Sequence, residues 1–464
     1  MTATITTTQP AASAGTFRGT LLPHQEAGLA FLRSQPRAIL ADEVGLGKTV
    51  QAAALIGSLH DSGELPAPKP DRLPVLWVTK AGLVTQTLAE LKRFLPDLWI
   101  FTLGNGKASA KVSEADKAMM RQHGAPHVVV TTHTMLQTQL RTYEAMRPQL
   151  VVVDEASALK GQGVQHQALK WACDDAPRVV AMTATPYENN PDELFGLFSL
   201  VGLPGLPTRE AYLRDYCEVR TFPDGTSKVE GWAFPAGIKA KAVRDAVRPY
   251  LLRRTVAEVG LALPTRADEP PRLVPLTARQ LGAYQWAQSG MADPLRRLAY
   301  QRKVSRHGKD GVGTLVPAAL AEVVALTGAG HKVVVYAEHL EDCDELSEGL
   351  TAAGIGHLSL RGENDKEERQ EAVDTFRDDE DILVLVGTKV LEFGLNLQFA
   401  NILVSVGVSF NPGRERQREG RICRIGSPHS TYRHISFLPD TPLTRRQIET
   451  LDRKERDAQA FLNA

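Results

Sequence analysis

Residues 39–50 read ILADEVGLGKTV, an apolar run that passes through a glycine-containing loop into a helical pattern, and this stretch decides the fold. A loop between a strand and a helix directs backbone N–H groups and the positive end of the helix toward phosphate. Gly45 and Gly47 allow the backbone to come close to such a ligand. Lys48 can reach the β- and γ-phosphates of a nucleotide, and Thr49 can bind Mg²⁺. The stretch therefore predicts a site for ATP and Mg²⁺ at the end of a buried strand.

A second apolar run, VVVDEASALK at residues 151–160, ends in the adjacent carboxylates Asp154 and Glu155. In a P-loop ATPase the first acid holds Mg²⁺ through water, and the second orients the attacking water. Neighbouring side chains on a strand point in opposite directions, so one site can use both acids only where the chain turns. The end of the strand supplies such a turn. Two solvated acids are the simpler interpretation, but Lys48 and Thr49 upstream favour a catalytic pair.

The composition of the 464 residues is that of a soluble globular protein, with 43% hydrophobic and 23% charged residues. This length predicts two or three domains. The chain has 54 lysine and arginine residues and 54 aspartate and glutamate residues, so its net charge is zero. Nucleic acid would therefore have to bind through a local basic groove. The four cysteines are far apart and form no CxxC pair, which argues against a zinc site or a disulfide framework.

The threonine- and alanine-rich start of the chain lacks the basic and apolar segments of a secretory signal, and we expect residues 1–15 to be a disordered tail. No apolar run approaches the roughly 18 residues of a membrane span. These features predict a cytoplasmic protein that makes no membrane contact, and we expect a monomer.

Short apolar runs alternate with helical patterns in both halves of the chain, which is typical of a parallel α/β sheet. These runs lie at residues 37–41, 74–79, 127–132, 150–155 and 178–185, and again at residues 331–337, 356–362, 381–388, 401–407 and 431–438. The pattern weakens between residues 203 and 315. We therefore predict a first α/β lobe at 16–264 with a helical insert near 205–250, connector helices at 265–315, and a second α/β lobe at 316–464.

An arginine-rich segment, NPGRERQREGRICRIG, occupies residues 411–426. Arg421 and Arg424 are three residues apart and would share one face of a helix, with Gln417 one turn earlier. Such a face can present guanidinium groups to a γ-phosphate bound on another lobe, and an arginine finger of this kind is worth roughly 10³–10⁵ in rate. For the other arginines of the segment, a solvated helix or a contact with a phosphate backbone is at least as good an interpretation.

Taken together and in order, the motifs resemble the Swi2/Snf2 family of superfamily 2 helicase-like ATPases from about Gly19 to Ser427. That family also carries aspartate where the general GxxxxGK[ST] loop has the glycine that Asp42 replaces here. The stretches that carry the resemblance are LLPHQEAGLAFL, ADEVGLGKT, VLWVTKAGLVTQTLAELKRF, VVVTTHTML, VVVDEASALKG, MTATPYENNPDELFGLFSLV and LLRRTVAEVGLALP, followed by KVVVYAEHLEDCDELSEGL, LRGENDKEERQEAVDTFRDDEDILVLVGT, TKVLEFGLNLQFANILV and QREGRICRIGS. The compact bacterial or phage forms near the RNA-polymerase recycling ATPase are the most similar branch, judging by ADEVGLGKT and NLQFA.

The resemblance implies two RecA-like P-loop lobes with ATP in the cleft between them, double-stranded DNA across both lobes, and ATP hydrolysis coupled to stepping along that DNA. The residues that it assigns to the nucleotide site are Gln25 for adenine, Gly45, Gly47, Lys48 and Thr49 for phosphate and Mg²⁺, Asp154 for Mg²⁺, Glu155 for water, and Gln417, Arg421 and Arg424 from the second lobe. Residues that would relay the nucleotide state are Ser157, Thr183 and Thr185, and candidates for contacts with DNA phosphates are Lys80, Thr132, Thr388, Lys389 and Asn396.

Two places depart from the family pattern. Ser157 stands where the family has a histidine that links the ATP site to motifs III and VI, and Leu391 and Glu392 replace two glycines of motif V. A glutamate near a DNA phosphate would repel it unless its side chain points away. These departures keep a DNA-binding scaffold with impaired ATPase open as an alternative. The others are a strand-separating DNA helicase and a remodeller of RNA polymerase or of another DNA-bound protein, such as a replication or recombination factor.

Overall fold

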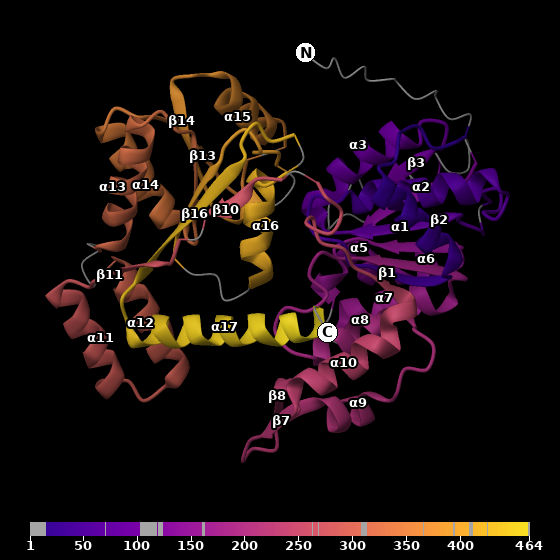
Figure 1. The fold of residues 1–464 in the computed structure, drawn as a ribbon, viewed down its shortest axis with the longest axis horizontal. Coiled ribbons are helices and arrows are strands. Elements are labelled where there is room, and N and C mark those ends of the chain that lie inside the picture. The colour runs from indigo at the N-terminus through magenta and orange to yellow at the C-terminus, as the bar shows by residue number, and fades with distance from the viewer. Residues whose placement is uncertain are drawn as a thin grey trace, which may run out of the picture. The chain divides into compact units, whose positions relative to one another are not determined.

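The computed structural model describes residues 15–69, 71–102, 118, 124–159, 163–261, 263–267, 269–307, 313–364, 366–392, 395–407, 412–424 and 426–462. The chain forms two compact units, one made of Met1–Val259 with Asp457–Ala464 and the other of Gly260–Arg456. Each unit contains one large sheet covered by helices (Figure 1). The predicted tail at residues 1–15 lies outside the described residues, apart from Gly15.

The first unit is built on a seven-stranded sheet with the order β3-β4-β2-β5-β6-β1-β9 (Figure 1). All of its pairings are parallel. Its strands are β1 (Arg37–Leu40), β2 (Val75–Thr79), β3 (Ile100–Thr102), β4 (Val128–Thr132), β5 (Leu150–Val153), β6 (Arg178–Met182) and β9 (Leu251–Leu252). Parallel strands that are covered on both faces read as continuous apolar runs, which is why these segments are visible in the sequence.

Alternate residues of these strands belong to two different cores. Val151 and Val153 of β5 pack with α5, α6, α7 and α8 on one face of the sheet. Leu150 and Val152 pack with α1, α2 and α3 on the other face. The helices of this unit are α1 (Pro23–Ser34), α2 (Lys48–Asp61), η1 (Ala81–Leu83), α3 (Val84–Phe94), α5 (His133–Thr138), α6 (Leu140–Ala145), η3 (Ala156–Leu159), α7 (Val164–Asp175) and α8 (Asp192–Val201). Burial on both faces fixes the strand register, because a shift by one residue would exchange the two cores.

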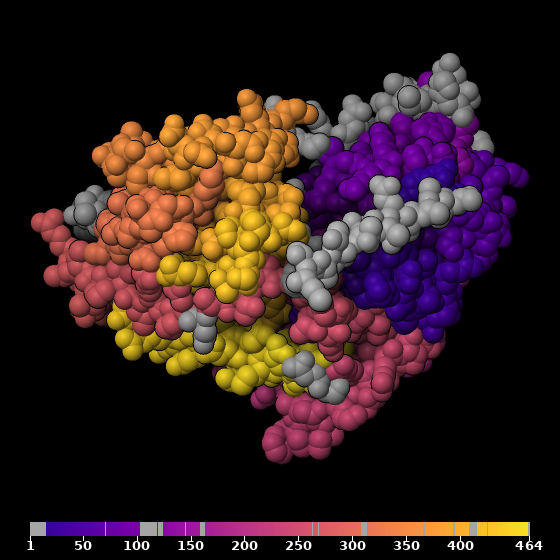
Figure 2. All heavy atoms as spheres, turned by 45° about the horizontal axis from the view of Figure 1, so that its top comes forward, coloured from indigo at the N-terminus to yellow at the C-terminus, as the bar shows by residue number. Residues whose placement is uncertain are grey.

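The insert predicted near residues 205–250 contains a hairpin as well as helices. Its elements are α9 (Arg209–Tyr216), β7 (Cys217–Thr221), β8 (Ser227–Trp232), α10 (Ala236–Val247) and η4 (Arg248–Tyr250). β7 and β8 are antiparallel, and Gly225 in their turn has a φ of 82°. The hairpin projects from the body of the first unit (Figure 1, Figure 2). Trp232 at its base packs into the core of the first unit.

The second unit is built on a sheet with the order β10-β16-β15-β12-β14-β13, and β11 also pairs with β16. Its strands are β10 (Thr265–Ala267), β11 (Arg272–Val274), β12 (Val333–Ala337), β13 (Gly356–Leu360), β14 (Ile382–Gly387), β15 (Ile402–Val406) and β16 (Thr431–Pro439). Every pairing in this sheet is parallel as well. The fold class predicted from the sequence, α/β with two parallel sheets, is therefore confirmed.

Helices cover both faces of the second sheet. Val333 and Val335 of β12 pack with α13 and α14, whereas Val334 and Tyr336 pack with α15, η5 and α16. The helices of this unit are α11 (Ala278–Gly290), α12 (Pro294–His307), α13 (Leu315–Gly328), α14 (Leu340–Ala352), α15 (Lys366–Asp378), η5 (Lys389–Glu392), α16 (Pro412–Ile422) and α17 (Pro442–Leu462). Among the helices of the described ranges, none combines the length and the hydrophobicity that a membrane-spanning segment requires.

The sequence and the structure divide the chain at slightly different places. Contacts separate the two units after Val259, whereas the sequence analysis placed the end of the first lobe at 264. β10 and β11 lie in the segment predicted as connector helices, yet they pair with β16 of the second sheet. Residues Asp457–Ala464 belong with the first unit, where the Trp232 indole donates to the Asp457 carbonyl at 3.1 Å. Strands of two or three residues are too short to show a period, so the sequence could not reveal them.

The chain that follows β9 fixes the phosphate loop at the edge of the first sheet. The backbone N–H of Ala41 donates to the Leu252 carbonyl at 2.7 Å, and that of Glu43 donates to the Arg254 carbonyl at 3.0 Å. The Glu43 carboxylate accepts from the backbone N–H of Val256 at 2.9 Å. The start of the loop is therefore paired along its length with a segment that is distant in sequence.

A buried ion pair completes this attachment and explains why aspartate replaces glycine at position 42. The Asp42 carboxylate is fully buried and accepts from Arg254 Nε at 3.0 Å and Nη2 at 2.5 Å. Gln51 of α2 donates to the same carboxylate at 3.0 Å and accepts from Arg254 at 2.9 Å. One carboxylate thus connects the loop, the helix that follows it and the end of β9. A bidentate arginine–carboxylate pair of this kind also fixes geometry.

We expect Arg254→Met to destabilise the first unit, because Asp42 would remain buried without its cation. Removing one partner of a buried ion pair costs about 3–5 kcal/mol, which corresponds to a fall of roughly 6–20 °C in the unfolding temperature of a unit of this size. Differential scanning calorimetry of the nucleotide-free protein measures this shift.

Two comparison variants make this experiment specific. Arg209→Met removes the more exposed pair with Asp192 and should shift the transition much less, because partly exposed ion pairs contribute little. The double variant Asp42→Asn, Arg254→Met should recover part of the loss, because no charge is left unpaired. An Arg254→Met protein that unfolds at the wild-type temperature would contradict the role assigned to this ion pair.

Candidate nucleotide site

The phosphate loop lies between β1 and α2, at the carboxyl edge of the first sheet. Gly45 and Gly47 have φ angles of 91° and 73°, a conformation that glycine adopts without steric cost. Gly47 is the N-cap residue of α2 and contributes no side chain, so the first backbone N–H groups of the helix point into the loop. The Lys48 ammonium donates to the carbonyls of Asp42 at 2.8 Å and Glu43 at 3.1 Å, and thereby crosses the loop.

Gln25, predicted to read adenine, lies directly against this loop. Its amide oxygen accepts from the Leu22 backbone N–H at 3.0 Å, which caps α1, and its amide nitrogen donates to the Leu46 carbonyl at 3.4 Å. A Cβ added at Gly47 would lie 2.4 Å from the same amide nitrogen. The structure therefore brings Gln25 and the phosphate loop together, and a contact with adenine stays a prediction.

The acid pair follows β5 at the same edge of the sheet, and the chain turns there as expected. Glu155 has a φ of 51°, a left-handed conformation that is strained for a residue other than glycine. Asp154 is held by the hydroxyl of Thr79 at 3.0 Å and by the backbone N–H of Glu155 at 3.0 Å. The turn allows two neighbouring carboxylates to serve one site, and strain of this kind is characteristic of functional sites.

Burial dominates the electrostatics of this edge. Loss of hydration raises the pKa of Asp154 to about 7, and the neighbouring Glu155 acts in the same direction. Burial lowers the pKa of Lys48, while the carboxylates of Glu155, Asp42 and Asp154 oppose that shift. Lys48 and the two acids therefore lie close enough to act on one another, although their motifs are distant in sequence.

The donors at this edge fit a Mg²⁺ ion. Mg²⁺ prefers oxygen ligands and usually keeps several waters, so one hydroxyl and one or two carboxylates are a sufficient set. The Thr49 hydroxyl and the Asp154 carboxylate are such oxygens. The raised pKa of Asp154 reports a buried carboxylate with too little positive charge around it, which a divalent cation would supply.

The predicted relay residues lie between the phosphate loop and the acid pair. Thr183 and Thr185 follow β6, the strand that separates β1 from β5 in the sheet, and both are buried. The Thr183 hydroxyl accepts from the Thr185 backbone N–H at 3.1 Å, and the Thr185 hydroxyl donates to Glu188 at 2.7 Å. Ser157 is buried in η3, just beyond Glu155. A role of these residues in relaying the nucleotide state stays a prediction.

The two DNA-contact candidates of the first unit have partners within the protein. Lys80 Nζ lies 3.8 Å from Glu155 Oε2, so this lysine faces the acid pair. The Thr132 hydroxyl caps α5 by accepting from the Met135 backbone N–H at 3.1 Å, and the side chain is only 2% exposed. In this conformation Thr132 therefore stabilises the start of α5.

His133 belongs to the site but was not identified from the sequence. Burial lowers its pKa to about 4, and Lys80 acts in the same direction, whereas a hydrogen bond with the Asp154 backbone opposes the shift. The imidazole is therefore neutral near pH 7 and packs beside the acid pair. A single histidine after a strand has no spacing pattern, so only the tertiary structure could reveal it.

The arginine-rich segment of the second unit forms α16, which carries Gln417 and Arg421. The helix ends at Ile422, so the prediction that Arg424 shares a helical face with Arg421 is wrong. Arg424 Nε instead donates to the Gly420 carbonyl at 2.8 Å. The last carbonyls of a helix have no partner within it, and here a side chain beyond the helix end supplies one.

Arg418 is buried, which corrects its interpretation as a solvated or phosphate-binding residue. Its guanidinium donates to Glu392 Oε1 through Nε at 3.1 Å and through Nη2 at 2.9 Å. Glu392 is itself completely buried, so it points into the second unit. The expectation that Glu392 would repel a DNA phosphate therefore does not apply in this conformation.

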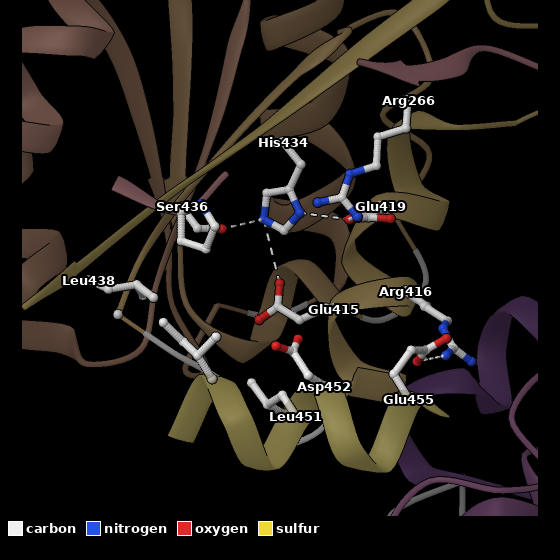
Figure 3. A pocket seen from close by; sticks show the side chains of 13 residues that line it. Arg266, Glu415, Arg416, Glu419, His434, Ser436, Leu438, Leu451, Asp452 and Glu455 are labelled. Atoms are coloured by element: carbon white, nitrogen blue, oxygen red, sulfur yellow. Dashed lines mark hydrogen bonds and ion pairs between the residues drawn. The ribbon is translucent and has the colours of Figure 1, made fainter. Parts of the chain in front are cut away.

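A second network contacts α16 and shares Glu415 with the network of Arg418. Figure 3 shows His434 of β16 facing Glu419 and Glu415 of the helix, beside a cavity of about 580 Å³. His434 Nδ1 lies 2.7 Å from Glu419 Oε1, and Arg266 pairs with the same oxygen at 3.0 Å. These groups hold the pKa of Glu419 below its usual range, although its burial acts in the opposite direction. Arg416 pairs with Glu455 of α17 (Figure 3). The helix α16 is thus held to β16 and to α17.

The remaining DNA-contact candidates surround η5. Thr388 precedes it and its carbonyl accepts from the Leu391 backbone N–H at 3.0 Å, while Lys389 begins η5 and is exposed. Asn396 is exposed, and its amide oxygen lies 3.5 Å from Arg424 Nη1. Contacts with DNA at these positions stay predictions.

The chain is similar to known proteins along most of its length. The model of the SNF2-related domain matches residues 24–314, and that of the helicase conserved C-terminal domain matches residues 316–426. The Danio rerio chromodomain-helicase-DNA-binding protein 1-like is 28% identical over 445 residues, which cover 88% of this chain and 40% of that protein. The putative ATP-dependent helicase/translocase YwqA of Bacillus subtilis is 24% identical over 457 residues, covering 92% and 47%.

A solved structure, the Sulfolobus solfataricus SWI2/SNF2 ATPase core in complex with double-stranded DNA, is similar with a TM-score of 0.44 and 18% identity, covering 97% of this chain and 96% of that one. The chain spans less than half the length of the two curated relatives named above. Because the SNF2-related model alone matches more than half of its residues, the chain belongs to the SNF2-related family of helicase-like ATPases.

Proposed function

We propose that this protein is an ATP-dependent double-stranded DNA translocase or remodelling ATPase of Snf2 type. The observation that carries the proposal is the convergence of Lys48, Asp154 and Glu155 at one edge of the first sheet, where both carboxylates act on the buried Lys48 ammonium. Membership of the family supports ATP as the substrate. The name of a relative, the chromodomain-helicase-DNA-binding protein 1-like of Danio rerio, supports DNA as the partner.

In this proposal the first unit binds the nucleotide and prepares the attacking water. The backbone N–H groups of the loop and the Lys48 ammonium hold the phosphates, and Lys48 leaves the carbonyls of Asp42 and Glu43 to do so. Thr49 and Asp154 would hold Mg²⁺, which when bound would neutralise charge on the phosphate oxygens. Glu155 orients the water, and the strained turn at this residue keeps its carboxylate close to Asp154.

The second unit contributes the groups that complete hydrolysis and couple it to DNA. Gln417, Arg421 and Arg424 present polar and cationic groups to the γ-phosphate. Thr388, Lys389 and Asn396, with Lys80 and Thr132 of the first unit, are the proposed contacts to DNA phosphates. Such contacts position a duplex without reading its sequence, so the proposal predicts no sequence preference. Thr183, Thr185 and Ser157 are the proposed relay.

We expect Glu155→Gln to bind ATP with unchanged affinity but to hydrolyse it about 10²- to 10⁴-fold more slowly, because the water loses the group that orients it. Steady-state phosphate release and calorimetric titration with ATP measure the two quantities. Asp192→Asn is a matched control, because the side chains of Asp192 and Glu155 are 25% and 23% exposed. Asp192 differs in its place, since it pairs with Arg209 and not with a group of the acid pair. Turnover near the wild-type rate in Glu155→Gln would refute the assignment of the acid pair.

We expect duplex DNA to stimulate the ATPase more than single-stranded DNA of equal length, because the proposed track binds both strands as a unit. The rate of hydrolysis is measured without DNA, with single strands and with duplex. Equal rates in all three would contradict a DNA translocase.

Two further measurements separate the alternatives. Displacement of a strand from a forked duplex at a rate that matches hydrolysis would favour a strand-separating helicase. Duplex binding without any hydrolysis would favour a DNA-binding scaffold, for which the replacement of the family histidine by Ser157 provides a reason.

A further inference from the structure

η5 has one end at the surface and the other in the core of the second unit. Lys389 at its start is exposed, whereas Glu392 at its end is completely buried. Thr388, just before the turn, accepts a hydrogen bond from Leu391 within it. Lys389, a proposed DNA contact, and Glu392 therefore belong to one short turn that a backbone hydrogen bond closes.

Arg418 of α16 receives the buried end of this turn. Its side chain is 1% exposed, and it donates to Glu392 with two nitrogens. The same guanidinium reaches Glu415 at 2.9 Å and Glu338 at 3.3 Å, and its central carbon lies 3.2 Å from the ring centroid of Tyr336. A planar cation with this many fixed partners has a single orientation.

Two further contacts connect the same two segments. The Leu397 backbone N–H donates to the Arg421 carbonyl at 3.2 Å, and Arg424 Nη1 lies 3.5 Å from Asn396 Oδ1. Three contacts thus join Glu392, Asn396 and Leu397 to α16 or to Arg424 beyond its end. Of these, the pair of Glu392 and Arg418 is the most buried, and two nitrogens of Arg418 donate to one oxygen of Glu392.

Stability alone does not explain a buried ion pair at this place. Well-packed apolar residues of similar volume often stabilise a core at least as well as a buried ion pair, because they require no desolvation of charge. A directional pair adds a defined relative orientation of the two segments that it joins. Glu392 also stands where the Swi2/Snf2 pattern has glycine, so a chain with that pattern lacks the carboxylate.

We propose that Glu392 and Arg418 are positioning residues that transmit the position of the DNA-contacting turn to α16, and thereby set the orientation of Gln417 and Arg421 toward the nucleotide. This inference rests on the proposed function, because it assigns the stimulation of hydrolysis by duplex DNA to one buried ion pair. Neither residue touches the nucleotide.

The test uses the full chain with Glu392→Gln and Arg418→Lys. In Glu392→Gln we expect basal hydrolysis to stay close to the wild-type rate, while the stimulation by duplex DNA falls about 2- to 30-fold, the range for mutations along a coupling network. Hydrogen exchange of the nucleotide-free protein should increase in peptides that cover η5 and α16. Arg418→Lys keeps the charge but loses the planar fork, so its stimulation should be intermediate.

Asp342→Asn is the matched control. Asp342 is also completely buried in the second unit and pairs with Arg306 at 3.4 Å and His307 at 2.7 Å, but it lies on α14. This variant should lose stability like Glu392→Gln yet keep the wild-type stimulation. If the Glu392 pair has a purely structural role, Glu392→Gln and Asp342→Asn should lose equal amounts of stimulation by duplex DNA, and this result would overturn the inference. Stimulation at the wild-type level in Glu392→Gln would also overturn it.

The two readouts separate this inference from the proposed function. If duplex DNA does not stimulate even the wild-type protein, the proposed function fails, and the exchange measurement then decides whether the pair joins the two segments. Unchanged exchange in α16 of Glu392→Gln would overturn the inference whatever the result of the DNA experiment.

Discussion

The parallel pairing of the strands is the constraint on which the rest of this structure depends. In a parallel sheet the carboxyl ends of all strands lie at one edge, so the segments that follow them become neighbours whatever their separation in sequence. The phosphate loop after β1, Thr183 after β6, the acid pair after β5 and Lys80 after β2 meet in this way. The order of the strands, and not the order of the motifs, decides which of these groups are adjacent.

Buried ion pairs hold chemically important segments in both units. Asp42 and Arg254 attach the phosphate loop to the end of β9, and Glu392 and Arg418 attach η5 to α16. Each pair joins two segments that no continuous strand or helix connects. A hydrophobic contact at the same place would tolerate sliding, whereas charge-assisted hydrogen bonds between a guanidinium and a carboxylate have a preferred distance and direction. The protein therefore places these charges where orientation matters more than the cost of desolvation.

The nucleotide edge combines strain with an unfavourable charge balance. Glu155 is held in a left-handed conformation, and burial raises the pKa of its neighbour Asp154. Lys48 is drawn to two backbone carbonyls of its own loop. A bound nucleotide with Mg²⁺ would supply both the negative charge that Lys48 can bind and the positive charge that the acids need. The unmatched charges at the carboxyl edge of the first sheet would destabilise a closed core, but they favour the binding of a charged ligand.

Much of this arrangement could be predicted from the sequence, because each apolar run contains a strand and the candidate functional residues come directly after these runs. Residues 39–50 and 151–160 predicted a phosphate loop and an acid pair, and the alternation of apolar runs with helical patterns along the chain predicted the parallel α/β class. Periodicity and glycine placement are local properties, so they are visible without a structure. Only the tertiary structure revealed the partner of Asp42 and the burial of Arg418 and Glu392. The same is true of the end of α16 before Arg424 and of the place of His133 beside Asp154. Each of these depends on which distant segment packs against a charged or polar side chain, and burial, which determines whether a charge is solvated or paired, is a property of the folded chain alone.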